Sequence, residues 1–224
     1  MTRFLSGLVL FVFGGIWIAT AQQATTARIR FVFENSKLQP ANYVLDINED
    51  GTGHFHSEPG SVTDADPQGV APQPVNTDIK INEPLRGALF KIARSHNYFE
   101  VACESTKSKV AFTGKKALQY SGPDGNGSCT YNWSRDQQLM KVTDDLIAVA
   151  FTIEEGRRLE VEHEHNRLGL DAELEQLQDA VKAGRAQQIQ NISSQLEAIA
   201  SDEKVLERAR SRARQLLAGN GSSG

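Results

Sequence analysis

The sequence predicts an α+β fold, in which an antiparallel β-sheet packs on two helices and a C-terminal all-α extension of short antiparallel helices follows. Three observations carry this prediction. The first part of the chain alternates apolar and polar residues with a period of two, which is typical of half-buried strands. Two later stretches repeat apolar residues at helical spacing, one after Pro84 and one from Val142 onward. The last third has narrow helical stripes joined by short connections, which favours antiparallel neighbours.

The predicted strands begin with an antiparallel meander. The segments "RIRFVFE" (28–34), "NYVLDIN" (42–48) and "GHFHS" (53–57) each place alternate apolar side chains on one face. Further strands are predicted at "DIKIN" (78–82), "KVAFTG" (109–114), "KALQY" (116–120) and "CTYNW" (129–133), with "SGPDGNGS" (121–128) as a turn-rich connection.

A β-rich domain with one helix is predicted for residues 22–140. Residues 57–77 are rich in proline and lack apolar periodicity, so we expect a flexible, irregular loop there. Pro84 suits the first position of a helix. The stripe of Leu85, Leu89, Ile92 and Ala93 continues that helix to about Arg94.

A long helix bridging both parts of the protein is predicted for residues 141–168. Thr143 is its expected capping residue, and acidic residues follow in its first turn. Its apolar stripe runs from Val142 to Ile153, and charged residues take over after Gly156. We therefore expect the first half of the helix to lie on the sheet and the second half to leave it.

Three short helices are predicted in residues 169–219, followed by a disordered tail at 220–224. The first is expected to run from Asp171 to Ala183 and the second from Arg185 to Ala200. Ser201 is expected to cap the third, which ends at Gly219. Helices of this length are unstable alone, so they should pack on one another and on the long helix.

The N-terminus predicts export. Arg3 precedes an apolar run from Phe4 to Ile18, and Ala19-Thr20-Ala21 forms a small-residue cleavage site, so residues 1–21 are interpreted as a signal peptide. The expected location is secreted or periplasmic, and an uncleaved N-terminal membrane anchor is the alternative. No later segment is apolar enough to span a membrane. Without Arg3 the chain has 23 basic and 28 acidic residues, a balance that argues against nucleic acid as a partner.

Cys103 and Cys129 are the only cysteines, and an exported chain matures where disulfides persist. We predict a disulfide between them, worth about 3–4 kcal/mol by the loop-entropy model. The alternative is two free thiols, one of them catalytic, but no sequence signature supports that role.

His54 and His56 are the candidate metal ligands, because residues two apart on a strand share a face. Two histidines leave a zinc site short of ligands. His96, Asp64 or Asp66 could supply a third. The alternative is that both histidines face solvent on the side opposite Phe55.

"EVEHEHNR" (160–167) holds His163 and His165, whose spacing separates them on a helix. The zinc-protease motif needs histidines four apart, and Arg167 occupies that position. We interpret the stretch as a solvated face of mixed charge. The alternatives are a metal site and a pH-sensitive role for His163 facing the helical extension.

Other chemical signatures are weaker. The arginines of "ERARSRARQ" (207–215) spread over two helix faces, which favours a solvated surface over a lipid or nucleic-acid patch. The G-x-S-x-G elbow and the phosphate-binding glycine loop are both missing from the sequence.

No catalytic residue and no cofactor is predicted. The leading hypothesis is a non-enzymatic envelope or extracellular protein that binds a partner protein or a cell-wall component. One alternative is a periplasmic metal-dependent or hydrolytic enzyme that uses His54 and His56. Another is a structural protein that self-associates through its C-terminal helices.

Overall fold

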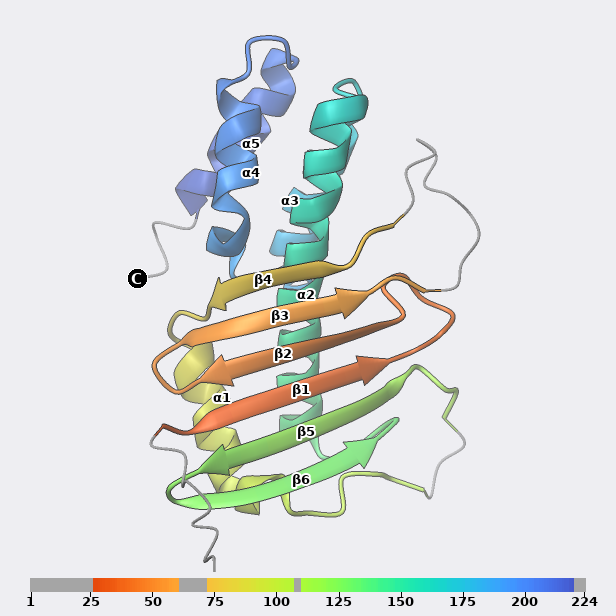
Figure 1. Ribbon diagram of the computed structural model, residues 1–224, viewed down its shortest axis with the longest axis vertical. Coiled ribbons are helices and arrows are strands. Elements are labelled where there is room, and N and C mark those ends of the chain that lie inside the picture. Colours follow the sequence, from red (N-terminus) through yellow and green to blue (C-terminus); the bar gives the residue numbers. More distant parts are fainter. Residues whose placement is uncertain (1–25, 61–71, 107–109, 220–224) are drawn as a thin grey trace, which may run out of the picture.

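The computed structural model describes residues 26–60, 72–106 and 110–219. It has an α+β fold, and the predicted combination of an antiparallel sheet, two packed helices and a helical extension is confirmed. Figure 1 shows the sheet in front, with the long helix rising behind it and continuing beyond its upper edge. Residues 1–25 and 220–224, and with them the signal-peptide and tail predictions, lie outside the described residues.

The sheet has six strands in the order β4-β3-β2-β1-β5-β6, and every neighbouring pair is antiparallel. The strands are β1 (Arg28–Glu34), β2 (Asn42–Asn48), β3 (Thr52–Glu58), β4 (Val75–Lys80), β5 (Lys115–Gly122) and β6 (Gly125–Tyr131). Their register aligns the inward side chains in rows. Phe31 lies between Leu45 and Leu118, so one row of apolar side chains crosses the middle of the sheet.

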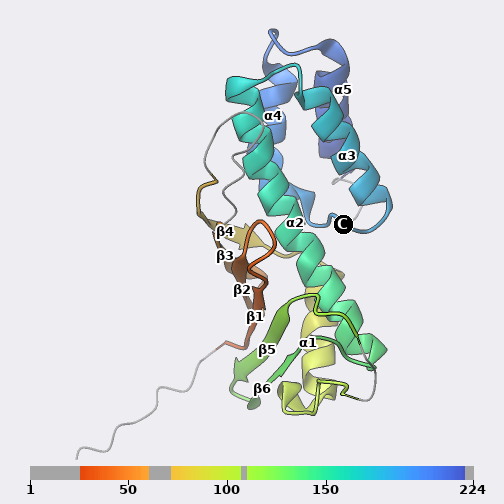
Figure 2. The same ribbon diagram turned by 90° about the vertical axis from the view of Figure 1, so that its right-hand side faces the viewer.

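Two helices cover one face of this sheet, α1 (Leu85–Ser95) and the first half of α2 (Gln137–His165) (Figures 1 and 2). The other face stays open and carries mainly polar and charged side chains, with Val32 and Val44 among them. On α2 the buried residues that meet the sheet side recur at helical spacing: Leu139, Val142, Leu146, Val149 and Ile153.

The second half of α2 forms a four-helix bundle with α3 (Leu170–Lys182), α4 (Ser193–Ser201) and α5 (Glu207–Gly219). A short 3₁₀ helix, η2 (Ile189–Ile192), leads into α4. Figure 2 shows the bundle above the sheet, with successive helices running in opposite directions. Leu159, Leu177, Leu196 and Ala213 are fully buried in its core.

Gly156 permits this packing on α2. A Cβ atom at this position would lie 2.4 Å from Cγ2 of Ile192, so only glycine lets η2 approach the helix so closely. The residue that marks the end of the apolar stripe in the sequence is therefore a contact point between α2 and the bundle.

The predicted start of the long helix is wrong. The helix begins at Gln137, and Asp136 caps it by accepting hydrogen bonds from the backbone N–H groups of Gln138 and Leu139. Thr143, the predicted cap, lies buried inside the helix, and its hydroxyl donates to the Leu139 carbonyl at 2.8 Å.

Two strand predictions also need correction. The fourth strand occupies Val75–Lys80 rather than 78–82, because Val75 and Thr77 continue its pairing with β3. The described part of "KVAFTG", residues 110–114, is no strand. The Asn132 side chain holds it instead, accepting from Thr113 N–H at 2.8 Å and donating to the Ala111 carbonyl at 3.1 Å.

The turn-rich connection at 121–128 is mostly strand, since β5 runs to Gly122 and β6 starts at Gly125. In the C-terminal part, residues 185–188 are not helical, although the second helix is predicted to begin at Arg185. Ser201 is the predicted cap of the third helix, but it is the last residue of α4, and α5 begins only at Glu207. Residues 202–206 form the connection to α5. Within it Val205 is buried and its N–H donates to the Asp202 carbonyl at 3.0 Å.

Among the described helices, none combines the length and the apolar character needed to cross a bilayer.

Candidate functional site

A cavity of about 990 Å³ lies where the lower end of the helical bundle meets the start of α1. We call it the junction cavity. Its walls come from the segment 82–88, from the first half of α2, from the C-terminal ends of α3 and α5, and from the connection between α3 and η2. Its lining residues are Asn82, Glu83, Pro84, Leu85, Ala88, Lys141, Asp145, Gln178, Val181, Lys182, Ala186, Gln187, Gln188, Ile189, Gln190, Gln215, Leu216 and Gly219.

The connection between α3 and η2 forms one wall of this cavity. Helix α3 ends through Gly184, whose positive φ of 70° is easily adopted by glycine. The next residues dock on α2, where Gln187 N–H donates to the Thr152 hydroxyl at 3.0 Å and its side-chain amide donates to Asp145 at 2.7 Å. Gln187 therefore attaches the connection to α2 through both its backbone and its side chain.

A second set of amide contacts joins this connection to the sheet. Gln188 adopts a left-handed conformation (φ 59°), and its side-chain oxygen accepts from Asn82 N–H at 2.7 Å. Gln190 donates to the Lys80 carbonyl at 2.9 Å. These contacts close the edge of β4 and form the rim of the junction cavity.

The charges of the lining balance one another. Lys141 pairs with the buried carboxylate of Asp145, and Lys182 pairs with Asp179 at 3.1 Å. Glu83 pairs with Arg86 at 2.9 Å. Most other lining groups are amides or aliphatic side chains, so the junction cavity offers hydrogen bonds without a net charge.

A smaller cavity of about 520 Å³ lies on the opposite side of α2, between residues 39–40, the end of β3 with Pro59, residues 72–73 and helix α3. Its charged residues are engaged in contacts with each other and with the sheet. Ser57 donates to Glu154 at 2.5 Å, and Arg157 pairs with the same carboxylate at 3.3 Å.

The structure places His54 and His56 side by side on the open face of the sheet, with Phe55 buried on the other face. His54 Nδ1 lies 2.9 Å from Asp78 and its Nε2 lies 2.7 Å from Asn76. The hydrogen bonds to Asp78 and Asn76 raise the pKa of His54. His56 contacts Glu58 at 3.0 Å.

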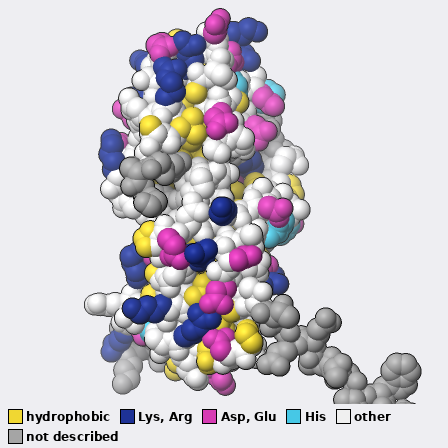
Figure 3. Space-filling model, turned by 90° about the vertical axis from the view of Figure 1, so that its left-hand side faces the viewer, with side chains coloured by type: hydrophobic (Ala, Val, Ile, Leu, Met, Phe, Trp, Pro, Cys, Tyr) yellow, Lys and Arg dark blue, Asp and Glu magenta, His cyan; other side chains and the backbone are white. Residues whose placement is uncertain are grey.

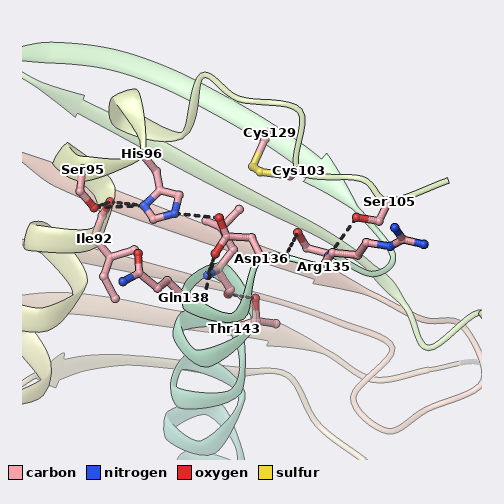
Figure 4. Close-up of polar contacts among 12 residues, drawn as sticks. Ile92, Ser95, His96, Cys103, Ser105, Cys129, Arg135, Asp136, Gln138 and Thr143 are labelled. Atoms are coloured by element: carbon pink, nitrogen blue, oxygen red, sulfur yellow. Dashed lines mark hydrogen bonds and ion pairs between the residues drawn. A yellow bond between two sulfur atoms is a disulfide. The ribbon is translucent and has the colours of Figure 1, made fainter. Parts of the chain in front are cut away.

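The third ligand considered for this pair does not join it. His96 lies at the end of α1, on the helix-covered side, where Nδ1 lies 3.0 Å from the Ile92 carbonyl and Nε2 lies 3.0 Å from Asp136 (Figure 4). Asp64 and Asp66 lie outside the described residues. In the parts of the chain that the structure describes, no three His, Cys, Asp or Glu side chains are grouped to hold a metal ion.

His96 helps to fix the start of α2. The backbone N–H of Leu139, the His96 ring and the N–H of Gln138 together lower the pKa of Asp136, although burial acts in the opposite direction. Figure 4 shows this cap next to the disulfide that joins Cys103 and Cys129, whose Cα atoms are 5.8 Å apart. The predicted cysteine pairing is therefore present, and it ties the segment after α1 to β6.

His163 lies near the end of α2, and its Nε2 is 2.9 Å from Asp202 in the connection between α4 and α5. Arg167 contacts the same carboxylate at 3.2 Å. His165 is half exposed and 3.7 Å from Glu164. The two histidines thus point to different neighbours, but the interpretation as a solvated face is incomplete, because Glu162 is buried.

Arg208 and Arg212 of α5 bind α3, whereas Arg210 and Arg214 pair with Glu207 of α5 itself. Arg212 reaches Asp171, Glu175 and Gln178 on α3 at 3.1, 3.0 and 2.8 Å. Arg208 also pairs with Asp171, at 3.0 Å. Figure 3 shows basic and acidic side chains intermingled on the face that it displays.

The junction cavity is the site that the sequence prediction missed. Its lining residues are dispersed from residue 82 to residue 219, so no single motif contains them. A local signal does exist, because "QQIQN" (187–191) concentrates side-chain amides in one short segment.

No protein-family model matches the chain, and no curated protein matches its sequence. The site is therefore interpreted from its own chemistry.

Proposed function

We propose that this chain is an exported, non-enzymatic binding protein whose ligand, part of a partner protein or of the cell wall, enters the junction cavity. The observation that carries the proposal is the cavity itself, which lies between two structural units and combines aliphatic walls with several amide groups. Ligand sites occur preferentially in such concave, partly apolar places between domains.

Export is supported by the disulfide between Cys103 and Cys129, because such bonds persist in oxidising compartments. The apolar run and small-residue site in residues 1–21 give the route by which the chain would reach such a compartment.

Binding rather than catalysis is supported by the composition of the lining. Within the described residues, the lining includes no Ser, Thr, Cys, Tyr or His side chain, so it lacks the hydroxyl, thiol and imidazole groups of many catalytic sites. Its carboxylates and amines are held in ion pairs instead. Asp145, for example, accepts hydrogen bonds from both Lys141 and Gln187.

Filling the cavity tests the proposal. Ala88 is an exposed residue on the wall that α1 contributes, so Ala88→Trp introduces a large ring into the cavity with little cost to the fold. We would titrate the isotopically labelled protein with solubilised cell-wall fragments and with envelope proteins from the native host, and follow its amide NMR signals. We expect shifts at lining residues that Ala88→Trp abolishes.

Ala198→Trp is the matched control, because Ala198 is exposed on α4 and does not line the cavity. It should leave the shifts unchanged. Shifts that lie outside the lining, or that persist in Ala88→Trp, would show that the ligand binds elsewhere.

A further inference from the structure

We infer that the junction cavity binds an extended, uncharged peptide segment with small aliphatic side chains. This inference rests on the proposed function and names the chemical class of its ligand. Three observations support it. The lining contains side-chain amides, its walls are aliphatic, and side-chain amides elsewhere in this protein already bind backbone N–H and carbonyl groups.

Side-chain amides bind extended backbone at two places in this structure. The Asn191 side chain accepts from Lys80 N–H at 2.8 Å and donates to the Lys80 carbonyl at 3.1 Å. Asn132 also uses both sides of its amide, but it spans two residues, accepting from Thr113 N–H and donating to the Ala111 carbonyl. An amide group matches a peptide backbone in this way because each carries one donor side and one acceptor side.

The amides of the junction cavity are only partly used. Gln188 and Gln190 bind the backbone of Asn82 and Lys80 through one atom each. Among the described residues, no hydrogen bond is made by Gln187 Oε1, Gln188 Nε2, Gln190 Oε1 or Gln215 Nε2. The cavity therefore has both donors and acceptors left for the backbone of a ligand.

The aliphatic walls indicate which side chains the ligand carries. Leu85, Ala88, Val181, Ile189 and Leu216 line the cavity, and Val181 is 37% exposed although it is apolar. Burial of aliphatic side chains against such surfaces is favourable by about 25 cal/mol per Å². Long charged side chains would instead lose hydration without gaining a partner, since Lys141, Asp145, Lys182 and Glu83 are already paired.

The lining favours a peptide over an oligosaccharide. Its described residues include no aromatic side chain, so no ring face is present on which a sugar could stack. Six amide side chains line the cavity, against four charged ones that are held in ion pairs. This distribution fits a ligand that is recognised through its amide groups rather than through charge.

The experiment compares the binding of two probes to the folded protein with its disulfide intact. One probe is a blocked peptide, acetyl-Ala-Val-Ala-Ala-Val-amide, and the other is chitotetraose. We would titrate each into labelled protein and follow the side-chain NH₂ signals of Gln187, Gln188, Gln190 and Gln215. We expect saturable shifts with the peptide, at least tenfold weaker binding of its N-methylated backbone analogue, and loss of the shifts in Ala88→Trp.

The outcomes separate the two proposals. If chitotetraose shifts these signals and the peptide does not, the peptide class is wrong while the cavity remains the binding site. If the peptide binds but Ala88→Trp has no effect, the cavity is not the site and the proposed function fails as well. If neither probe shifts the signals, the inference of a peptide ligand is overturned, and the titration with host fractions decides the proposed function separately.

Discussion

Asn191 replaces a missing β-strand at the edge of the sheet, because its side-chain amide bonds to both backbone groups of Lys80, with distances of 2.8 and 3.1 Å. Lys80 belongs to β4, the edge strand next to the bundle. Edge strands expose unpaired backbone groups, and covering them prevents unwanted pairing. The contact also fixes η2, and through it the bundle, to the sheet.

We therefore predict that Asn191→Asp destabilises the protein by about 0.5–1.5 kcal/mol, the usual net contribution of a hydrogen bond, because these contacts are exposed to solvent. The variant keeps an acceptor but loses the Nδ2 donor, and it places a carboxylate beside the Lys80 carbonyl. The free energy of unfolding, measured in urea, checks this. Asn126→Asp on the exposed part of β6 is the control and should change stability by less than about 0.5 kcal/mol.

The disulfide gives a second prediction. Cys103 and Cys129 are 26 residues apart, and the loop-entropy model assigns about 3.5 kcal/mol to closing such a loop. The double variant Cys103→Ser/Cys129→Ser should therefore have a free energy of unfolding lower by about 3.5 kcal/mol, seen as a denaturation midpoint at lower denaturant concentration.

Thiol titration checks the pairing itself. The native wild-type protein should react with no equivalents of a thiol reagent without reductant, and with two after reduction and unfolding. Reaction of two thiols in the native state would contradict the disulfide.

Local patterns account well for the sheet and for the existence of the helices. β1 and β2 have the predicted bounds because every inward side chain at the alternate positions is apolar and buried, although Val32 and Val44 add one apolar side chain each to the open face. The start of α2 is different. Thr143, Asp144 and Asp145 look like a helix cap, but the true cap is Asp136, and the buried Thr143 and Asp145 face partners from distant parts of the chain.

The candidate site could not be predicted because its residues meet only through tertiary packing. The sequence predicts a solvated face for the charged stripe at residues 160–167, at the end of α2, yet Glu162 in that stripe is buried. The sequence does not reveal that a second layer covers this stripe. The predicted histidine pair, in contrast, does share a strand face, because that relation depends only on local geometry.

A third prediction concerns the end of the bundle, where Asp202 accepts hydrogen bonds from Lys204 N–H, from His163 and from Arg167. These contacts, with the Lys204 N–H foremost, lower the pKa of Asp202 to about 2. A carboxylate with a lowered pKa in the folded state stabilises the protein above its unfolded pKa near 3.9, and that stabilisation is lost as the pH falls toward 2.

Asp202→Asn should therefore lower the melting temperature at pH 7, and the difference from wild type should vanish as the pH approaches 2. Asp179→Asn is the control, because Asp179 makes only an exposed helix pair with Lys182. A difference that stays constant from pH 7 to pH 2 would show that Asp202 acts through packing rather than through its charge.

The fourth prediction concerns Glu155, which is 3% exposed and lies between α2 and α3. Its Oε1 pairs with Arg158 at 2.9 Å, while no described group donates a hydrogen bond to its Oε2. Burial raises the pKa of Glu155, and Glu173 on α3 and Glu154 on α2 add to this, whereas Arg158 and Arg157 oppose it. The folded protein therefore binds this proton more readily than the unfolded chain does.

For a carboxylate with a raised pKa, the folded state is most stable below the unfolded pKa near 4.3 and loses stability as the pH rises through the folded pKa. Glu155→Gln removes this loss. We expect the variant to be more stable than wild type at pH 7 and to lose that advantage as the pH falls to 4, in urea unfolding measured across this range. Glu160→Gln, on the exposed face of α2, should follow the wild-type curve. If Glu155→Gln were less stable than wild type at pH 7, the ion pair with Arg158 would outweigh the cost of burying the charge, and the bundle would depend on that pair.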